Sequence, residues 1–165
     1  MSNFTESCTL NAKTVADSAT EQIQILMPGH INGFQRLFGG KLVEWIDVVA
    51  AVVARRHSNR NVTTVTIDNL QFKEPARVNS TLVLSGRMTY VGKTSMEVRV
   101  DTYIETLSGY KKLINTAYLV LVALDEDENP TPVPALITQT EEEAAEFEAG
   151  KRRRDLRAQR RTDKY

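Results

Sequence analysis

One stretch of the sequence decides the fold, NGFQRLFGGKLVEWID at residues 32–47. It begins as a loop, passes through the paired glycines Gly39 and Gly40, and continues as an apolar helix to about Arg56. Within the helix, apolar side chains recur at helical spacing, which predicts one buried face. The residues on that face are Leu42, Ile46, Val49, Ala50 and Val53.

The junction between this loop and helix is suited to binding a negatively charged oxygen. Glycine lets a ligand approach the backbone closely, and the first N–H groups of a helix have no hydrogen-bond partner within it. Such groups bind anions or stabilise an oxygen that gains negative charge during a reaction. Asp47 lies about two helical turns beyond Gly40, so it points to the same side of the helix as the glycines.

Asp47 has two interpretations that the helical periodicity leaves open. It lies roughly opposite the predicted buried face and beside Glu44, which is typical of a carboxylate in solvent. Its other neighbours, Val43, Ala51 and Ala54, are small or apolar, which favours a carboxylate that faces a pocket or another subunit. The pattern of the residues alone does not choose between these interpretations.

Motifs spread from about residue 23 to residue 136 resemble the signature of the cytosolic acyl-CoA thioesterases with a hotdog fold. They are Asn32, LFGGKL at 37–42, WID at 45–47, ARRH at 54–57, VTT at 62–64, Asp68, Phe72, Pro75, VGKTSMEV at 91–98, VALD at 122–125 and VP at 133–134. The chain departs from the pattern at Gln35, where the family usually has a glycine or another small residue. We expect this difference to bear on the conformation of the loop and the acyl-chain preference more than on the chemistry.

The resemblance implies a hydrolase that releases a free fatty acid and CoA, with no metal ion and no cofactor other than the CoA of its substrate. Asp47 would be the general base or the nucleophile, and Asn32 would orient the water or the carbonyl group. The backbone N–H of Gly40, next to Gly39, would polarise the thioester oxygen. The residues expected to lie along the CoA are Gly92, Lys93, Thr94 and Ser95, which also read simply as a hairpin turn.

The resemblance also implies a homo-oligomer, either a dimer or a trimer of dimers that forms a hexamer. In such a dimer, Asn32 of one subunit would face Asp47 of its mate, and symmetry would give two equivalent sites. The residues alone leave a second arrangement open, because the loop that carries Asn32 could fold back onto its own helix.

Two other functions fit the same fold, because fold alone does not determine function. One is a non-catalytic regulatory module that binds acyl-CoA. The other is a hotdog hydroxyacyl-thioester dehydratase, which would normally need a histidine base, although His30 and His57 are poorly placed for that role. No Gly-x-Ser-x-Gly motif indicates a serine triad, and the two histidines and Cys8 are too far apart in the sequence to favour a zinc site.

The composition is that of an ordinary globular protein in a reducing compartment. The 165 residues are 41% hydrophobic and 25% charged, and the formal net charge is zero, so no overall positive field indicates a nucleic-acid partner. The single cysteine, Cys8, excludes an internal disulfide. With no signal peptide at the start and no run of 18 apolar residues, we expect a cytoplasmic protein that does not interact with membranes.

The order of the predicted elements indicates an α+β fold with three regions. Alternating patterns predict strands at residues 21–27, 62–72, 81–91, 94–105 and 110–124, and these would form a curved antiparallel sheet around the single central helix. We expect a flexible N-terminal arm at 1–19, a hotdog domain at 20–137 and a charged helical tail at 138–165. The uncovered side and edge of the sheet favour pairing with a second copy.

The tail places glutamates at its start and a block of lysine and arginine at its end, an order that suits the helix dipole. Gly150 interrupts it and is expected to weaken the helix. One interpretation is a solvated helix. The other is a basic arm that reaches the phosphates of a bound CoA on its own or a neighbouring subunit. Nucleic-acid binding is less favoured, because no aromatic residues interleave with the block apart from Tyr165.

Overall fold

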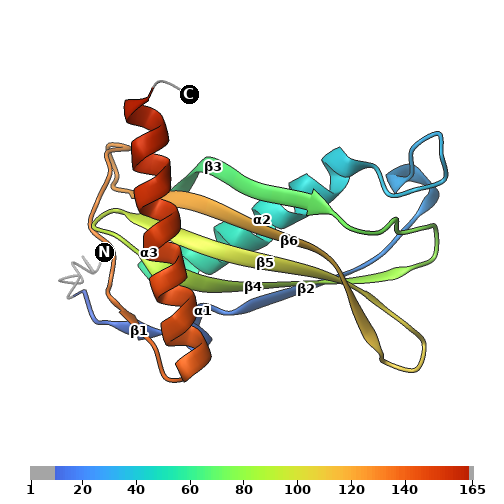
Figure 1. The fold of residues 1–165 in the computed structure, drawn as a ribbon, viewed down its shortest axis with the longest axis horizontal. Coiled ribbons are helices and arrows are strands. Elements are labelled where there is room, and N and C mark those ends of the chain that lie inside the picture. The colour runs from blue at the N-terminus through green and yellow to red at the C-terminus, as the bar shows by residue number, and fades with distance from the viewer. Residues whose placement is uncertain (1–9, 164–165) are drawn as a thin grey trace, which may run out of the picture.

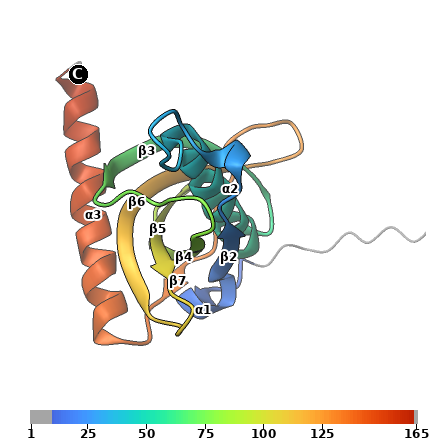
Figure 2. The same cartoon turned by 90° about the vertical axis from the view of Figure 1, so that its right-hand side faces the viewer.

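The computed structural model describes residues 10–163, in which a five-stranded antiparallel sheet curls around the long helix α2 (Gly39–Ser58), as Figures 1 and 2 show. The strands of this sheet are β2 (Thr20–Ile25), β4 (Thr81–Val91), β5 (Ser95–Glu105), β6 (Lys111–Leu124) and β3 (Asn61–Phe72), in their order across the sheet. The smaller elements are β1 (Lys13–Thr14), α1 (Val15–Ser18), η1 (Pro28–His30) and β7 (Leu136–Ile137). A second long helix, α3 (Glu141–Thr162), follows them. The predicted α+β hotdog arrangement is confirmed.

Helix α2 is held in the sheet by the apolar face that its sequence predicts. All five residues of that face are buried, with Ile46 and Val53 fully excluded from solvent. The helix lies close to strand β4 at Gly86, where a Cβ atom would lie 2.6 Å from the Val49 side chain and 3.0 Å from that of Val53. A larger residue at position 86 would therefore push the helix away from the sheet.

The two faces of the sheet differ in chemistry. Strand β5 alternates along its length, so that Met96, Val98 and Val100 join the core around α2, as the sequence predicts. Its intervening residues, among them Glu97 and Arg99, make hydrogen bonds to α3 on the outer face. The inner face is therefore apolar, and the outer face is charged although it is covered.

Helix α3 covers part of that outer face, crossing the strands on the side opposite α2 (Figures 1 and 2). Gly150 is buried at the crossing, where a Cβ atom would lie 2.6 Å from the Cβ atom of Tyr90 and 3.0 Å from Oε1 of Glu97. The interpretation of the tail as a solvated helix is therefore wrong for this face. Gly150, expected to be a weak point of the helix, is where the helix touches the sheet.

Part of the predicted flexible arm is also ordered. Residues 13–18 form β1 and α1, β1 pairs in parallel with β7, and Val15 and Ser18 are buried. Thr14 and Asp17 cap the short helix reciprocally, through an N–H···O bond of 2.7 Å in one direction and 3.3 Å in the other. The expectation of a flexible arm is wrong for these residues, because a four-residue helix is too short to show a periodic pattern. Cys8 lies outside the described residues.

No helix within residues 10–163 is long and apolar enough to cross a membrane.

Candidate active site

The carboxylate of Asp47 is half-buried on the side of α2 that faces strand β3. The Thr64 hydroxyl of β3 donates a hydrogen bond to Oδ1 of Asp47 at 2.7 Å. Glu44, one turn earlier, is instead exposed and pairs with Lys41 at 2.7 Å. The two neighbouring carboxylates of α2 therefore differ: Glu44 extends into solvent, and Asp47 is fixed against the sheet.

The glycines at the start of α2 leave two backbone donors available. Phe38, the N-cap residue, makes no capping hydrogen bond with its side chain, and the first helical N–H group with a partner is that of Lys41, which donates to the Phe38 carbonyl at 3.0 Å. Within residues 10–163 the N–H groups of Gly39 and Gly40 have no acceptor. A Cβ atom on Gly40 would lie 2.6 Å from the ring of Phe38, so a larger residue there would displace this half-exposed side chain.

Asn32 organises the loop that precedes these glycines. Its Oδ1 atom accepts hydrogen bonds from the N–H groups of Phe34 at 2.9 Å and Arg36 at 3.2 Å. Because the oxygen is occupied, the side-chain NH₂ group is the part that remains for a ligand, and it has no partner elsewhere in the described chain. Asn32 is therefore arranged as a hydrogen-bond donor.

Gln35, the departure from the family pattern, lies at the tip of the same loop with φ of 58°. This left-handed conformation is costly for residues with a Cβ atom and readily adopted by glycine. This chain adopts the turn with a glutamine, where a glycine would adopt it at lower cost.

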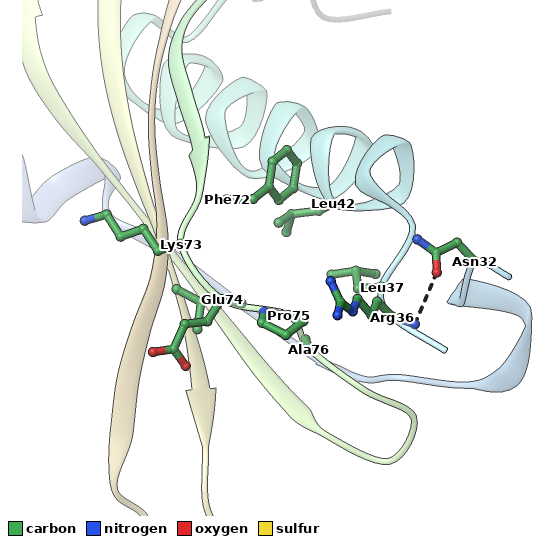
Figure 3. Close-up of a pocket in the computed structure, with 10 residues that line it drawn as sticks. Asn32, Arg36, Leu37, Leu42, Phe72, Lys73, Glu74, Pro75 and Ala76 are labelled. Carbon is green, nitrogen blue, oxygen red and sulfur yellow. Dashed lines mark hydrogen bonds between the residues drawn. The ribbon is translucent and has the colours of Figure 1, made fainter. Parts of the chain in front are cut away.

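Asn32 lines a cavity of about 290 Å³ (Figure 3). The other lining residues are Arg36, Leu37, Leu42, Phe72, Lys73, Glu74, Pro75, Ala76 and Ile114. Asp47 is not among them, so this cavity does not contain both predicted catalytic side chains. Phe72 links the cavity to the glycines, because its ring lies 3.4 Å from where a Cβ atom of Gly39 would be.

Of the four residues predicted to lie along CoA, three form the turn between β4 and β5, and Ser95 is the first residue of β5. The N–H of Gly92 donates to the Ser95 carbonyl at 2.8 Å. The Lys93 carbonyl accepts from the Val133 N–H at 3.0 Å, and the Thr94 carbonyl accepts from the Ala123 N–H of β6 at 3.1 Å. A Cβ atom on Gly92 would lie 4.0 Å from Nε of Arg154, so the turn is next to α3. The structure thus brings this turn close to the basic tail, and it separates both from the Asn32 cavity.

Helix α3 is fixed to the outer face by a network of charged groups. Arg153 donates to Glu97 at 2.8 Å and to Glu146 at 2.9 Å, and its guanidinium group lies 3.9 Å from the centre of the Tyr118 ring. Burial raises the pKa of Glu146, but hydrogen bonds from Arg153 and Tyr118 and the charge of Arg99 outweigh it, so the pKa lies below its ordinary value. Burial also raises the pKa of the Tyr118 hydroxyl.

Both histidines make structural contacts, and neither is hydrogen-bonded to Asp47. His57 is buried at the end of α2, with Nε2 2.9 Å from the Pro134 carbonyl oxygen, and burial lowers its pKa despite that hydrogen bond. His30 accepts from the Met27 N–H at 3.1 Å and packs edge-on against Trp45. No group of three or more potential metal ligands occurs among residues 10–163.

Thr64 is the member of the site that sequence reasoning missed. Its segment, VTT at 62–64, is one of the motifs of the resemblance, but nothing in the local pattern connects it with Asp47. The contact joins residues 17 positions apart, from a helix and a strand, so only the tertiary structure shows it.

Comparison with known proteins gives a consistent result. A model of the thioesterase superfamily matches residues 34–108. A Bacillus subtilis protein named as an uncharacterized acyl-CoA thioester hydrolase is 39% identical over 119 residues, which is 72% of this chain and 69% of that protein. The chain spans only 38% of the length of its mammalian relatives, which are named cytosolic acyl coenzyme A thioester hydrolases.

Two solved structures are similar over almost the whole chain. An apo-hexameric acyl-CoA thioesterase has a TM-score of 0.87 and 38% identity, covering 91% of this chain and 97% of its own. An acyl-CoA hydrolase from Staphylococcus aureus, in complex with butyryl-CoA and CoA, has a TM-score of 0.88 and 28% identity, covering 93% and 94%. Variants of that enzyme have an asparagine, an aspartate or a threonine replaced by alanine, and the separations between those residues equal those between Asn32, Asp47 and Thr64.

Proposed function

This chain belongs to the acyl-CoA thioester hydrolases of the thioesterase superfamily, and we propose that it cleaves acyl-CoA to a free fatty acid and CoA with Asp47 as its catalytic carboxylate. The observation that carries this proposal is the hydrogen bond of 2.7 Å from Thr64 to Asp47. It fixes one oxygen of the carboxylate and leaves the other without a hydrogen-bond partner among the described residues. The matching separations of the replaced residues in the Staphylococcus aureus enzyme support the same assignment.

The reaction needs few groups, because the thiolate of CoA is a good leaving group. As general base, Asp47 takes a proton from water as the water oxygen bonds to the thioester carbon. As nucleophile, it forms an anhydride that water then opens. In both routes the C–S bond breaks, the sulfur leaves with the electron pair and takes up a proton, and the carboxylate is regenerated.

The remaining groups stabilise and orient the reacting atoms. The N–H groups of Gly39 and Gly40 point out of the start of α2, where they polarise the thioester carbonyl and stabilise the oxyanion that forms on it. Asn32 acts through its free NH₂ group, which donates to the attacking water or to the carbonyl oxygen. The turn residues Gly92, Lys93, Thr94 and Ser95 lie along the CoA portion of the substrate.

We also propose that a second copy of the chain completes each site. Asn32 lines the cavity described above, whereas Asp47 lies outside it, beside the edge strand β3. Large apolar side chains along this edge and the facing side of α2 are about half exposed, namely Phe38, Val48, Val65, Ile67 and Phe72. A dimer along β3 covers them, and three dimers give a homohexamer like that of the similar apo structure.

The activity is tested with a panel of acyl-CoA substrates of increasing chain length, with release of free thiol as the signal. Asp47→Asn should retain CoA binding and lose about 10²-fold or more in kcat. Glu44→Gln, which removes a neighbouring exposed carboxylate of α2, is the matched control and should keep full activity. Binding of acyl-CoA without thiol release would reject hydrolysis and favour the regulatory module, and normal turnover of Asp47→Asn would reject the catalytic role of Asp47.

The shared site is tested by co-expressing two inactive variants, Asn32→Asp and Asp47→Asn. Asn32→Asp keeps the oxygen that the Phe34 and Arg36 N–H groups need, and it replaces the free NH₂ donor with an oxygen of a negatively charged carboxylate. In a mixed dimer with shared sites, one site carries both changes and the other carries neither, so activity returns. If both residues act within one chain, every site is damaged, and verified mixed dimers stay inactive.

A further inference from the structure

A second cavity, of about 320 Å³, lies between α3 and the outer face of the sheet. Four arginines of α3 line it together with side chains of the sheet, and we refer to it as the arginine pocket. The arginines are Arg154, Arg157, Arg160 and Arg161. Their spacing of three or four residues places them on one face of the helix.

Helix α3 is held over the sheet by a buried carboxylate, which binds only one of the four pocket arginines, Arg157. Glu97 is only 1% exposed, and it accepts hydrogen bonds from Arg153 at 2.8 Å and Arg157 at 2.9 Å. Gly150 lets the helix come into contact with the strand beneath it. These contacts determine which face of α3 lines the arginine pocket.

The remaining arginines leave the pocket with an excess of positive charge. The two carboxylates in its wall, Glu97 and Asp68, are both bonded to Arg157, and Asp68 lies 3.9 Å from Arg160. Arg154 reaches only the hydroxyl of Tyr90, at 3.4 Å. Arg161 has no carboxylate within ion-pair distance in the part of the chain that the structure describes.

The neighbours of these arginines suit a phosphorylated ligand. Ser95 and Thr66 place hydroxyl groups in the wall of the pocket, and guanidinium groups with hydroxyl groups are the usual partners of phosphate oxygens. Arg154 lies beside Gly92, so the pocket adjoins the turn assigned to CoA. Along β3, Thr66 of the pocket is two residues from Thr64, which bonds Asp47.

We propose that the arginine pocket binds the phosphate groups of the CoA portion of the substrate, an inference that rests on the proposed function. Acyl-CoA has a phosphorylated end and a reactive thioester end joined by the long pantetheine chain, and the two candidate regions match these two ends in chemistry. Arg154 and Arg161 are the anchors, because the ion pairs of α3 with the sheet do not use them.

The test replaces both anchors, in Arg154→Gln with Arg161→Gln, and compares two substrates. Loss of two charge-assisted hydrogen bonds should raise KM for acyl-CoA by about tenfold or more with little change in kcat. The corresponding acyl-pantetheine has no phosphate groups, so its hydrolysis should not change. Lys151→Gln with Arg152→Gln is the matched control, because these exposed residues of α3 lie outside the pocket and the charge change is the same.

An unchanged KM for acyl-CoA would overturn the proposal. So would an equal rise with acyl-pantetheine, or an equal rise in the control variant, which would show an effect of the total charge of the helix. The melting temperature should stay that of the parent, because neither anchor takes part in the Glu97 contacts.

Direct binding separates this inference from the proposed function. Calorimetry with CoA and with inorganic pyrophosphate should show binding to the parent that the anchor variant weakens and Asp47→Asn retains. A chain that binds CoA through the arginines but hydrolyses no acyl-CoA would reject the hydrolase and keep the pocket. A chain that hydrolyses acyl-CoA and binds CoA equally well without the arginines would reject the pocket alone.

Discussion

The two long helices lie on opposite faces of one sheet and are held there by different forces. Helix α2 packs through apolar side chains such as Ile46 and Val53, which are fully buried. Helix α3 is docked through a buried carboxylate, Glu97, and through arginines whose long apolar stems cover the sheet. The comparison shows that a face rich in charge can be an internal contact surface.

The largest effect should come from placing a charge in the face of α2. Val49→Asp puts an unpaired carboxylate against the sheet, and we expect a loss of about 3–5 kcal/mol in the free energy of unfolding. Denaturant unfolding followed by circular dichroism measures this loss. Val48→Asp is the matched control, because Val48 is half exposed, and its change should appear as weaker association in sedimentation while the chain stays folded. Equal unfolding curves for parent and Val49→Asp would reject the packing of α2.

The sequence predicted α2 better than α3 for a physical reason. Apolar residues at helical spacing are expected to pack in the core, and the face of α2 that is buried is the face that the sequence predicts. Glu97 and Arg153 have the sequence pattern of residues that face solvent. Burying the charge of Glu97 would be costly without a partner, and the hydrogen bond from Arg153 offsets that cost. Periodicity does not report pairing between a strand and a helix that lie 56 positions apart.

The candidate site likewise contains residues that the sequence identifies and contacts that only the tertiary structure shows. Asp47 and Asn32 were identified through a resemblance, whereas periodicity left Asp47 undecided between solvent and a pocket. The Thr64 contact with Asp47 and the closeness of Gly92 to Arg154 depend on the tertiary structure. Residues 13–18 were missed because their order depends on contacts of Val15 and Ser18 with the rest of the fold.

A smaller effect should follow from filling the contact point of α3. Helix propensity alone predicts that Gly150→Ala stabilises an exposed helix by about 1 kcal/mol. Its Cβ atom, however, would lie 2.6 Å from the Cβ atom of Tyr90, which is not the flexible end of a side chain. We expect a net loss of about 1–3 kcal/mol from overpacking, measured by denaturant unfolding.

Ala158→Gly, at an exposed position of α3, reports the propensity effect alone. A stabilising Gly150→Ala would show that the helix is free of the sheet at this point. Removal of α3 after Leu136 should likewise destabilise the chain, because it exposes Glu97 and the side chains around it.

Acid should weaken the anchoring of the two helices in different pH ranges. Burial lowers the pKa of His57, at the end of α2, despite the Pro134 hydrogen bond, so the stability it contributes is full above the ordinary value of 6.5 and is lost as the pH falls through the lowered pKa. The pKa of Glu146 in α3 is also lowered, because hydrogen bonds from Arg153 and Tyr118 outweigh burial. Its contribution is full above the ordinary value of 4.5 and is lost at lower pH.

Unfolding measured between pH 7 and pH 3 should therefore show two separate losses of stability. His57→Gln should remove the first loss and Glu146→Gln the second, each leaving the other in place. A single loss that neither substitution changes would contradict this assignment.

The smallest effect concerns the loop before α2, where Gln35 holds a left-handed conformation with φ of 58°. Gln35→Gly relieves that conformational cost but adds freedom to the unfolded chain, so we expect a net stabilisation of about 1 kcal/mol or less. Asn79→Gly is the control, since Asn79 has φ of 69° but asparagine tolerates this conformation, and its effect should be smaller. Unfolding in denaturant measures both, and the acyl-CoA panel shows whether the change in the Asn32 loop alters chain-length preference.

If Gln35→Gly destabilises the chain more than Asn79→Gly does, the glutamine side chain contributes a contact that outweighs its backbone cost. The tip of the loop would then be set by its own side chain, as α3 is set by its arginines, and not by backbone geometry alone.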